Sequence, residues 1–279
     1  MTTNILSDRF EYQCKASLNL YDSPKCDQLA TQAAVGRHLR LHPQDVNGLT
    51  HDKQAIKVEL CEDDYPGWLA RADLNQIEPV QKLYIPRVIS TEVIRQRLPE
   101  VIAFTKQAME TPNQYLWGGT VGPNYDCSGL MQAAFASVGI WIPRDAYQQQ
   151  SFARTLPIFV EPPTEQGLTK RMGAELNADQ TSHLTTDPPK FRSEIAQTPK
   201  NHREIVLSYL LPGDLVFFGK QDKATHVGLY LGEGTYIHSS GTDQGHNGIG
   251  IDVLSEHGNQ VSQTYYQQLQ GAGRIIASY

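Results

Sequence analysis

The spacing of apolar and polar positions changes along the chain and divides it into two parts. In the first part short apolar runs alternate with polar neighbours, and Ile56, Val58 and Leu60 follow the period-two pattern of a half-buried strand. No helical period of useful length occurs there. We therefore predict a small β-barrel of the SH3 kind over residues 1–80, followed by a linker over residues 81–90.

The second part, residues 91–279, begins with a helical period. Val101, Thr105 and Met109 recur at helical spacing, so a first helix is predicted there, with Pro99 placed to suit its first turn. A second helix is predicted from Cys127 to Val138. Strand-like runs follow at Leu215–Phe218, His226–Leu231 and Tyr236–Ser239. Helices first and strands afterwards predict an α+β domain.

A polar stretch rich in Pro, Thr, Lys and Glu interrupts this domain at residues 157–204. Structureless loops longer than about 12–15 residues are uncommon in compact domains. We therefore predict a long, mobile insertion that carries no chemistry, since the informative motifs lie on either side of it.

The start of the second predicted helix carries the first candidate for chemistry. Asp126 is a good N-cap residue, which puts Cys127 in the first helical turn. The partial positive charge of a helix N-terminus favours a thiolate, the nucleophilic form of cysteine. Gly129 leaves backbone amides accessible for an oxyanion. Taken alone, Cys127 fits a small buried residue better than a nucleophile.

Two histidines on successive predicted strands supply the second candidate. His226 opens an apolar strand, and His238 lies on the next one after the turn at 232–234. Such a hairpin brings the two rings close together, and a base oriented by a third polar group is the general logic of a catalytic triad. Each histidine alone is more often structural, whereas the combination with Cys127 favours catalysis.

These segments together resemble the NlpC-type branch of the papain-like cysteine peptidases. The matching motifs are YLWGG at 115–119, DCSG at 126–129, THVGLYLG at 225–232 and IHSS at 237–240. The N-terminal part resembles the bacterial SH3-like domains found beside such catalytic domains. The whole arrangement is similar to the cyanobacterial-type γ-D-glutamyl-L-diamino acid endopeptidases, except in the insertion.

The resemblance implies a mechanism. Cys127 would attack the carbonyl of the γ-D-glutamyl–diaminopimelate bond and form an acyl-enzyme. His226 would take the thiol proton and pass it to the leaving amine, while His238 orients its imidazole. The hydroxyl of Tyr115 would help to hold the oxyanion. No metal or other cofactor is expected.

The resemblance also implies where a substrate binds. Asp126 and Ser128 would shape the pocket around the D-glutamate. Relatives with two domains recognise a free N-terminal L-Ala partly through the SH3-like domain, and an ammonium group needs a carboxylate and hydrogen-bond acceptors. Tyr65 and Asp73 are the candidates from this domain, although both also suit ordinary surface roles. The fallback carboxylates are Asp64 and Glu62. The expected partner is a released peptidoglycan peptide, in cell-wall recycling.

Composition narrows the setting. The net charge of −6 argues against a nucleic-acid binder that depends on a basic surface. Residues 1–10 lack the apolar run of a secretory signal, and no segment approaches the roughly 20 apolar residues that span a bilayer. The four cysteines are too sparse for a disulfide framework. We therefore expect a cytoplasmic protein without membrane or nucleic-acid partners, and the oligomeric state stays open.

Two alternatives remain from the sequence. A thioester intermediate can pass its acyl group to an acceptor other than water, so an acyltransferase or amidase on the same fold is possible chemistry. A non-catalytic protein that binds the cell wall is the second alternative, against which the joint presence of Cys127, His226 and His238 argues. A metal site built from these three residues is weaker, because metal ligands usually occur as closely spaced pairs.

Overall fold

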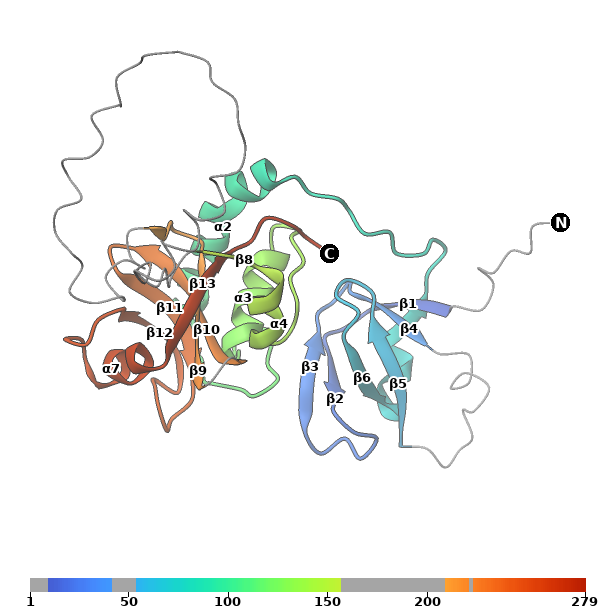
Figure 1. Ribbon diagram of the computed structural model, residues 1–279. Coiled ribbons are helices and arrows are strands. Elements are labelled where there is room, and N and C mark those ends of the chain that lie inside the picture. Colours follow the sequence, from blue (N-terminus) through green and yellow to red (C-terminus); the bar gives the residue numbers. More distant parts are fainter. Residues whose placement is uncertain (1–9, 42–53, 157–208, 221–222) are drawn as a thin grey trace, which may run out of the picture. The chain divides into compact units, whose positions relative to one another are not determined.

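The computed structural model describes four stretches of the chain: residues 10–41, 54–156, 209–220 and 223–279 (Figure 1). The predicted insertion at 157–204 lies outside the described residues. Residues 1–155 and 211–279 belong to one compact unit, so the contacts below lie within that unit. No helix among the described residues is long and apolar enough to cross a membrane.

The N-terminal part is a seven-stranded antiparallel sheet with the order β3-β2-β6-β5-β4-β1-β7. Its strands are β1 (Phe10–Cys14), β2 (Leu18–Tyr21), β3 (Leu29–Ala33), β4 (His38–Leu41), β5 (Ala55–Leu60), β6 (Pro66–Ala70) and β7 (Ile77–Pro79), with the 3-10 helix η1 (Arg71–Gln76) before β7. The predicted alternation is real, because Ile56, Val58 and Leu60 all point into the core of this sheet from β5.

The C-terminal part combines helices with a six-stranded antiparallel sheet of order β12-β11-β10-β9-β13-β8. The helices are α2 (Thr91–Glu110), α3 (Cys127–Ala136), α4 (Ala146–Phe152) and α7 (Gln260–Gln267). The strands are β8 (Arg154–Thr155), β9 (Leu215–Lys220), β10 (Lys223–Gly232), β11 (Thr235–Ser240), β12 (Gly248–Val253) and β13 (Leu269–Arg274). The predicted α+β class is confirmed.

The helix bounds differ from the prediction in two places. Pro99 lies inside α2 rather than in its first turn, because Ser90 caps that helix nine residues earlier by accepting a hydrogen bond from the Val93 amide. Helix α3 ends at Ala136, two residues before the predicted end. Gly139 follows with a φ of +74°, a left-handed conformation that glycine adopts without steric cost.

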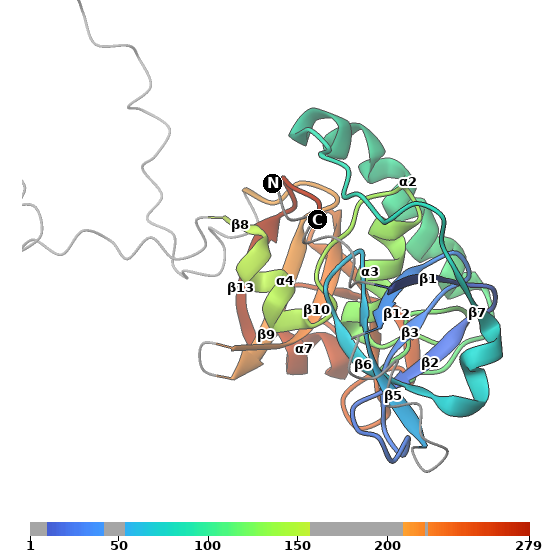
Figure 2. The ribbon, with the colours of Figure 1, turned by 90° about the vertical axis from the view of Figure 1, so that its right-hand side faces the viewer.

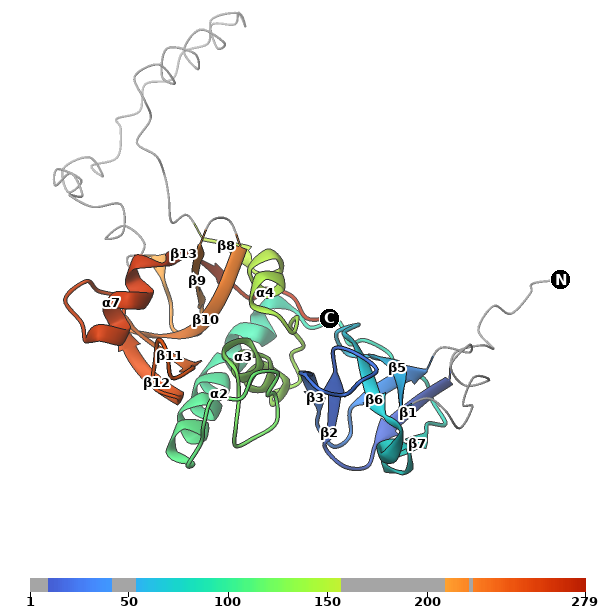
Figure 3. The same cartoon turned by 90° about the horizontal axis from the view of Figure 1, so that it is seen from below.

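The packing of α3 fixes the candidate nucleophile against the sheet. Leu130, Met131, Ala134 and Phe135 of this helix are fully buried and join one apolar core with residues of β9, β10 and β11. Helix α2 packs along α3 (Figure 2). Figures 1 and 3 show α3 and α4 on one side of the six-stranded sheet and α7 on the other. The N-terminus of α3 is thereby held rigidly beside β10.

Candidate active site

Backbone hydrogen bonds to one carboxylate organise the start of α3. Asp126 is the N-cap: its Oδ1 accepts from the Gly129 amide at 2.7 Å, and its Oδ2 accepts from the Gly118 amide at 2.8 Å. Cys127 is the first residue of the helix, as the sequence predicts. A Cβ on Gly129 would collide with the Gly119 carbonyl, so glycine is required where the two segments meet.

The thiol of Cys127 is only 6% exposed, and its surroundings favour the neutral form. Burial raises the pKa of Cys127 to about 12, and the negative charge of Asp126 adds to the rise. The amides of Val227 and Ser128 and the charge of Arg144 act in the opposite direction without overcoming burial. Desolvation thus opposes the thiolate that the helix N-terminus is expected to favour.

Three side chains from adjacent strands form a continuous hydrogen-bonded relay. His226 Nε2 lies 2.7 Å from His238 Nδ1, and His238 Nε2 lies 2.8 Å from Asp252 Oδ2. They come from β10, β11 and β12 respectively. Tyr265 of α7 stacks on the His226 ring with centroids 4.3 Å apart, and the charge of Cys127 contributes to the raised pKa of that tyrosine. Tyr265 thus contacts the imidazole and lies within electrostatic range of the thiol.

Burial also keeps both histidines of the relay neutral. It lowers the pKa of His226 well below its ordinary value, with the neighbouring His238 adding to the effect, and it lowers the pKa of His238. Burial alone would raise the pKa of Asp252, but hydrogen bonds from the two histidines and the serine that it contacts lower it below the usual range. The relay therefore ends in a carboxylate.

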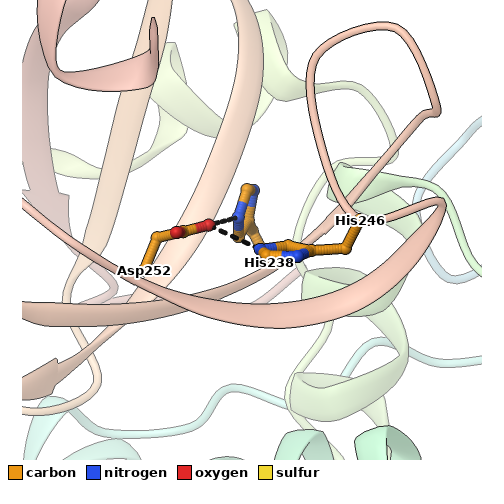
Figure 4. A group of neighbouring side chains, drawn as sticks. All are labelled: His238, His246 and Asp252. Carbon is orange, nitrogen blue, oxygen red and sulfur yellow. Dashed lines mark hydrogen bonds and ion pairs between the residues drawn. The ribbon is translucent and has the colours of Figure 1, made fainter. Parts of the chain in front are cut away.

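Asp252 accepts more hydrogen bonds than the relay requires. His246 Nε2 lies 2.8 Å from the same Oδ2 that contacts His238 (Figure 4). Ser262 Oγ donates to the other oxygen, Oδ1, at 2.8 Å. The side chains of Asp252 and His238 are fully buried, whereas that of His246 is 32% exposed. His246 therefore connects this buried carboxylate to the solvent.

A cavity of about 380 Å³ opens onto the nucleophile. Of the residues singled out in the sequence, those that line it are Tyr65, Tyr115, Asp126, Cys127 and Ser128. His226 is not part of the lining, although its neighbour Thr225 is. Cavities of about 430 and 600 Å³ lie elsewhere, and Cys127 lines neither. The structure thus gathers five of the eight predicted site residues around one cavity, and His226 and His238 are not part of its lining.

Asp73 is the predicted site residue that the structure leaves apart. It belongs to η1 and lies near Cys26, whose pKa its charge helps to raise, and it does not line the cavity. The fallback carboxylates are also engaged elsewhere. Glu62 pairs with Arg37 at 3.2 Å, and Asp64 pairs with Arg40 at 2.9 Å. None of these three candidate carboxylates lines the cavity. Among the described residues of the SH3-like part, Asp22 is the carboxylate that does.

Two adjacent residues that sequence reasoning missed complete the cavity. Arg144, 2% exposed, forms a bidentate ion pair with Asp126, with Nη1–Oδ1 at 3.1 Å. Asp145 Oδ1 accepts a hydrogen bond from the Tyr65 hydroxyl at 3.3 Å. Burial raises the pKa of Asp145, while Arg144 and Tyr65 partly offset the rise. The sequence does mark Asp145 as an N-cap with Gln148 three residues later, but that signal concerns only the start of α4.

Comparison with known proteins shows the family to which this domain belongs. The profile of the NlpC/P60 family matches residues 112–270, more than half of the chain. The chain belongs to the NlpC/P60 family. Members of this family are cysteine peptidases, in agreement with the predicted resemblance. A profile described as the bacterial dipeptidyl-peptidase Sh3 domain matches residues 20–74, which confirms the predicted SH3-like part.

Several curated proteins share the NlpC/P60 region. The chain is 27% identical over 179 residues to the bifunctional muramidase/DL-endopeptidase CwlT of Bacillus subtilis, covering 62% of this chain and 40% of that protein. It is 26% identical over 157 residues to the gamma-D-glutamyl-L-lysine dipeptidyl-peptidase of the same organism, covering 55% and 33%. It is 30% identical over 180 residues to the murein DD-endopeptidase MepH of Escherichia coli, covering 63% and 45%. The matches thus span less than half the length of these relatives.

Solved structures include relatives as well. An NlpC/P60 family protein from Bacillus cereus aligns over 96% of this chain and 64% of its own, with 21% identity and a TM-score of 0.39. The peptidoglycan hydrolase RipB of Mycobacterium tuberculosis aligns over 69% of both chains, with 23% identity and a TM-score of 0.39.

Proposed function

We propose that the protein is a cysteine endopeptidase that hydrolyses the γ-D-glutamyl–diamino acid bond of peptidoglycan-derived peptides carrying a free N-terminal L-Ala. The observation that carries the proposal is the Tyr65–Asp145 hydrogen bond in the wall of the cavity that Cys127 lines. A carboxylate and a phenol oxygen side by side are suitable acceptors for an ammonium group.

The charges around the cavity favour binding of a positively charged end of the substrate. Its lining includes the carboxylates of Asp22, Asp126 and Asp145 and the cations of Arg144 and Lys223. Arg144 is already held by Asp126 in a buried pair. Asp145 is a half-buried carboxylate, and burial raises its pKa because water solvates its charge less well. A bound ammonium group would stabilise that charge by pairing with it. We therefore assign to Asp145, with Tyr65, the role first expected of Asp73.

The proposed chemistry starts from a neutral pair. His226 uses Nε2 to contact His238, which leaves Nδ1 as the nitrogen that can accept the thiol proton. As the Cys127 sulfur attacks the γ-carbonyl carbon of the D-glutamyl residue, its proton passes to His226 Nδ1. His238 accepts from His226 Nε2–H and donates its own Nε2–H to Asp252, so the charge that forms on the imidazole is stabilised by a carboxylate.

The intermediate then collapses to a thioester. His226 Nδ1–H protonates the leaving amine of the diamino acid, and the C–N bond breaks. A water molecule, deprotonated by the same imidazole, attacks the thioester and releases L-Ala-γ-D-Glu with a free thiol. The Tyr115 hydroxyl and the amides at the start of α3 are suited to hold the oxyanion in both steps.

The names of the relatives support the reaction class. Two curated relatives, from Bacillus subtilis and Bacillus cereus, are gamma-D-glutamyl-L-lysine dipeptidyl-peptidases. The other two are named as a muramidase/DL-endopeptidase and a DD-endopeptidase, so the names agree on a peptidase more than on one bond. The feature that favours dipeptide release here is the amine-binding pair, because an endopeptidase acting on intact wall has no free L-Ala amine to bind.

The test compares hydrolysis of L-Ala-γ-D-Glu-diaminopimelate with that of its N-acetylated form. Wild-type protein should cleave only the free-amine peptide, and Cys127→Ala should cleave neither. Asp145→Asn should lower kcat/KM for the free-amine peptide by about 10- to 100-fold, the loss of one charge-assisted hydrogen bond. The matched control is Asp73→Asn, which removes the same charge outside the cavity and should keep wild-type selectivity.

Each other outcome points to a different function. Equal cleavage of both peptides would remove the amine-binding role of Asp145 and leave a thiol endopeptidase. Transfer of the acyl group to an added amine in place of hydrolysis would support an acyltransferase. Binding of the peptide with neither cleavage nor alkylation of Cys127 would support a wall-binding protein.

A further inference from the structure

Behind the relay lies a set of side chains that the proposed reaction does not use in full. His238 and His246 both direct Nε2 at the single oxygen Oδ2 of Asp252, each at 2.8 Å (Figure 4). The three possible ligand atoms all lie within 4.8 Å of one another. The relay needs only the His238 bond, so the second imidazole has no role in proton transfer.

We propose that His238, His246 and Asp252 form a binding site for a zinc-class divalent cation, and that cation binding there switches the peptidase off. Two imidazoles and one carboxylate are a donor set that suits zinc and its transition-metal neighbours. The set suits magnesium and calcium poorly, because both prefer oxygen ligands throughout.

Cation binding requires the three ligand atoms to change their spacing. Zinc lies about 2.0–2.2 Å from imidazole nitrogen and carboxylate oxygen in a tetrahedron, which separates its ligands by roughly 3.3 Å. Each imidazole nitrogen must therefore retreat about half an ångström from Asp252, and the two nitrogens, now within 4.8 Å of each other, must take the same spacing. His246 is able to do so because it lies in the connection between β11 and β12, outside both strands. Its exposed edge provides an entry path and room for water as a fourth ligand.

The surroundings of the three residues are already built as a metal site requires. Ser262 Oγ holds the second oxygen of Asp252 at 2.8 Å, and such outer hydrogen bonds orient ligating carboxylates. A Cβ on Gly250 would collide with the His246 ring, so the glycine leaves the space that lets this imidazole lie over β12. His238 is fully buried, and its hydrogen bond to His226 orients the ring with Nε2 toward Asp252.

The effect on catalysis follows from where protons lie, and this step rests on the proposed function. In the metal-free relay His238 carries its proton on Nε2 and accepts from His226 Nε2–H. A cation on His238 Nε2 displaces that proton to Nδ1, since a neutral imidazole carries one N–H. His238 Nδ1–H then donates to His226 Nε2, so the proton of His226 must lie on Nδ1. His226 Nδ1, the nitrogen proposed to accept the thiol proton, then no longer has a lone pair for it.

Cation binding is tested first, without reference to activity. The full-length Cys127→Ala protein, which lacks the active-site thiol, is titrated with Co²⁺ and its visible spectrum recorded. One Co²⁺ per chain should bind, without the charge-transfer band of a thiolate ligand, and Zn²⁺ should displace it. Adding His246→Gln should abolish this binding, whereas adding His257→Gln, a change at an 87% exposed histidine, should not. No binding, or equal binding with His246→Gln, would overturn the site.

The switch is tested separately on the active protein. Zn²⁺ should abolish hydrolysis of the free-amine peptide, and a chelator should restore it. The rate of the His246→Gln variant is measured against its own metal-free rate. Half-inhibition of this variant should need a Zn²⁺ concentration at least roughly 10-fold higher than for wild type, because even the loss of a residue that only hydrogen-bonds to a ligand weakens metal binding by that much. Equal inhibition of this variant would place the inhibitory cation on Cys127 and overturn the switch. If no peptide were cleaved at all, the proposed function would fail while the Co²⁺ titration still decided the site.

Discussion

The charge at the end of the relay gives the sharpest test of the mechanism. In Asp252→Asn the side-chain oxygen can still accept from His238 Nε2, and the amide nitrogen can donate to Ser262 Oγ, so the shape of the network is kept while the charge is lost. Hydrogen bonds to charged groups contribute about 1.5–3 kcal/mol. If that contribution is felt only as the imidazole becomes charged, kcat should fall by about 10- to 150-fold.

The same variant should leave substrate binding alone. Asp252 does not line the cavity, so KM for the free-amine peptide should stay within about twofold of wild type, since a group that acts only in the transition state changes kcat. The assay measures kcat and KM for release of L-Ala-γ-D-Glu in buffer containing a chelator. Asp243→Asn is the matched control, because Asp243 is an exposed acid in the same β11–β12 connection. A folded Asp252→Asn protein with wild-type kcat would refute the relay.

Two substitutions and one labelling experiment test the construction of the site further. Gly129→Ala should abolish hydrolysis, because its Cβ has no space beside the Gly119 carbonyl and must displace the turn that carries Cys127; peptide turnover and far-ultraviolet circular dichroism check this. Arg144→Gln should lower the free energy of unfolding in urea by about 3–5 kcal/mol, since it leaves the buried Asp126 without its charge partner, and a loss below 1 kcal/mol would contradict that reasoning. Alkylation of Cys127 by iodoacetamide should accelerate about tenfold per pH unit from pH 7 to 9, because a thiol with a pKa of about 12 is mostly protonated there; peptide mapping of Cys127 checks this, and a plateau below pH 7 would indicate a preformed thiolate.

Local patterns carried most of the fold. The alternation in β5 and the apolar face of α3 depend on neighbouring residues along the chain, and both lie where their periodicity predicts. The start of α3 could also be predicted, because the cap residue Asp126 directly precedes the helix. The start of α2 was harder to predict. Pro99 fits a first turn, but it is also tolerated inside a long helix whose N-cap, Ser90, lies further upstream.

The residues that the sequence hid are those whose role depends on tertiary contact. Asp145 and Tyr65 are 80 residues apart, and nothing in either local pattern predicts their hydrogen bond. Asp73 looked as suitable as Asp145 because both are acids in polar surroundings, and only the fold decides which of them lines the cavity. From the sequence, Asp252 is only a polar position in an alternating strand. Its role depends on the register that places β12 beside β11, where Asp252 pairs with Tyr236, two residues from His238.

Burial is the common cause of the chemistry proposed here. Removing Cys127 from water raises its pKa, and removing His226 lowers its own, so the two shifts together disfavour a charged thiolate–imidazolium pair before substrate arrives. The proton must then move as the sulfur attacks, and the barrier depends on how well the relay receives it. Asp252 supplies the only charge in the hydrogen-bonded chain of three residues that runs from His226. A cation bound between Asp252 and the Nε2 atoms of His238 and His246 would therefore remove the charge-stabilised proton path on which the barrier depends.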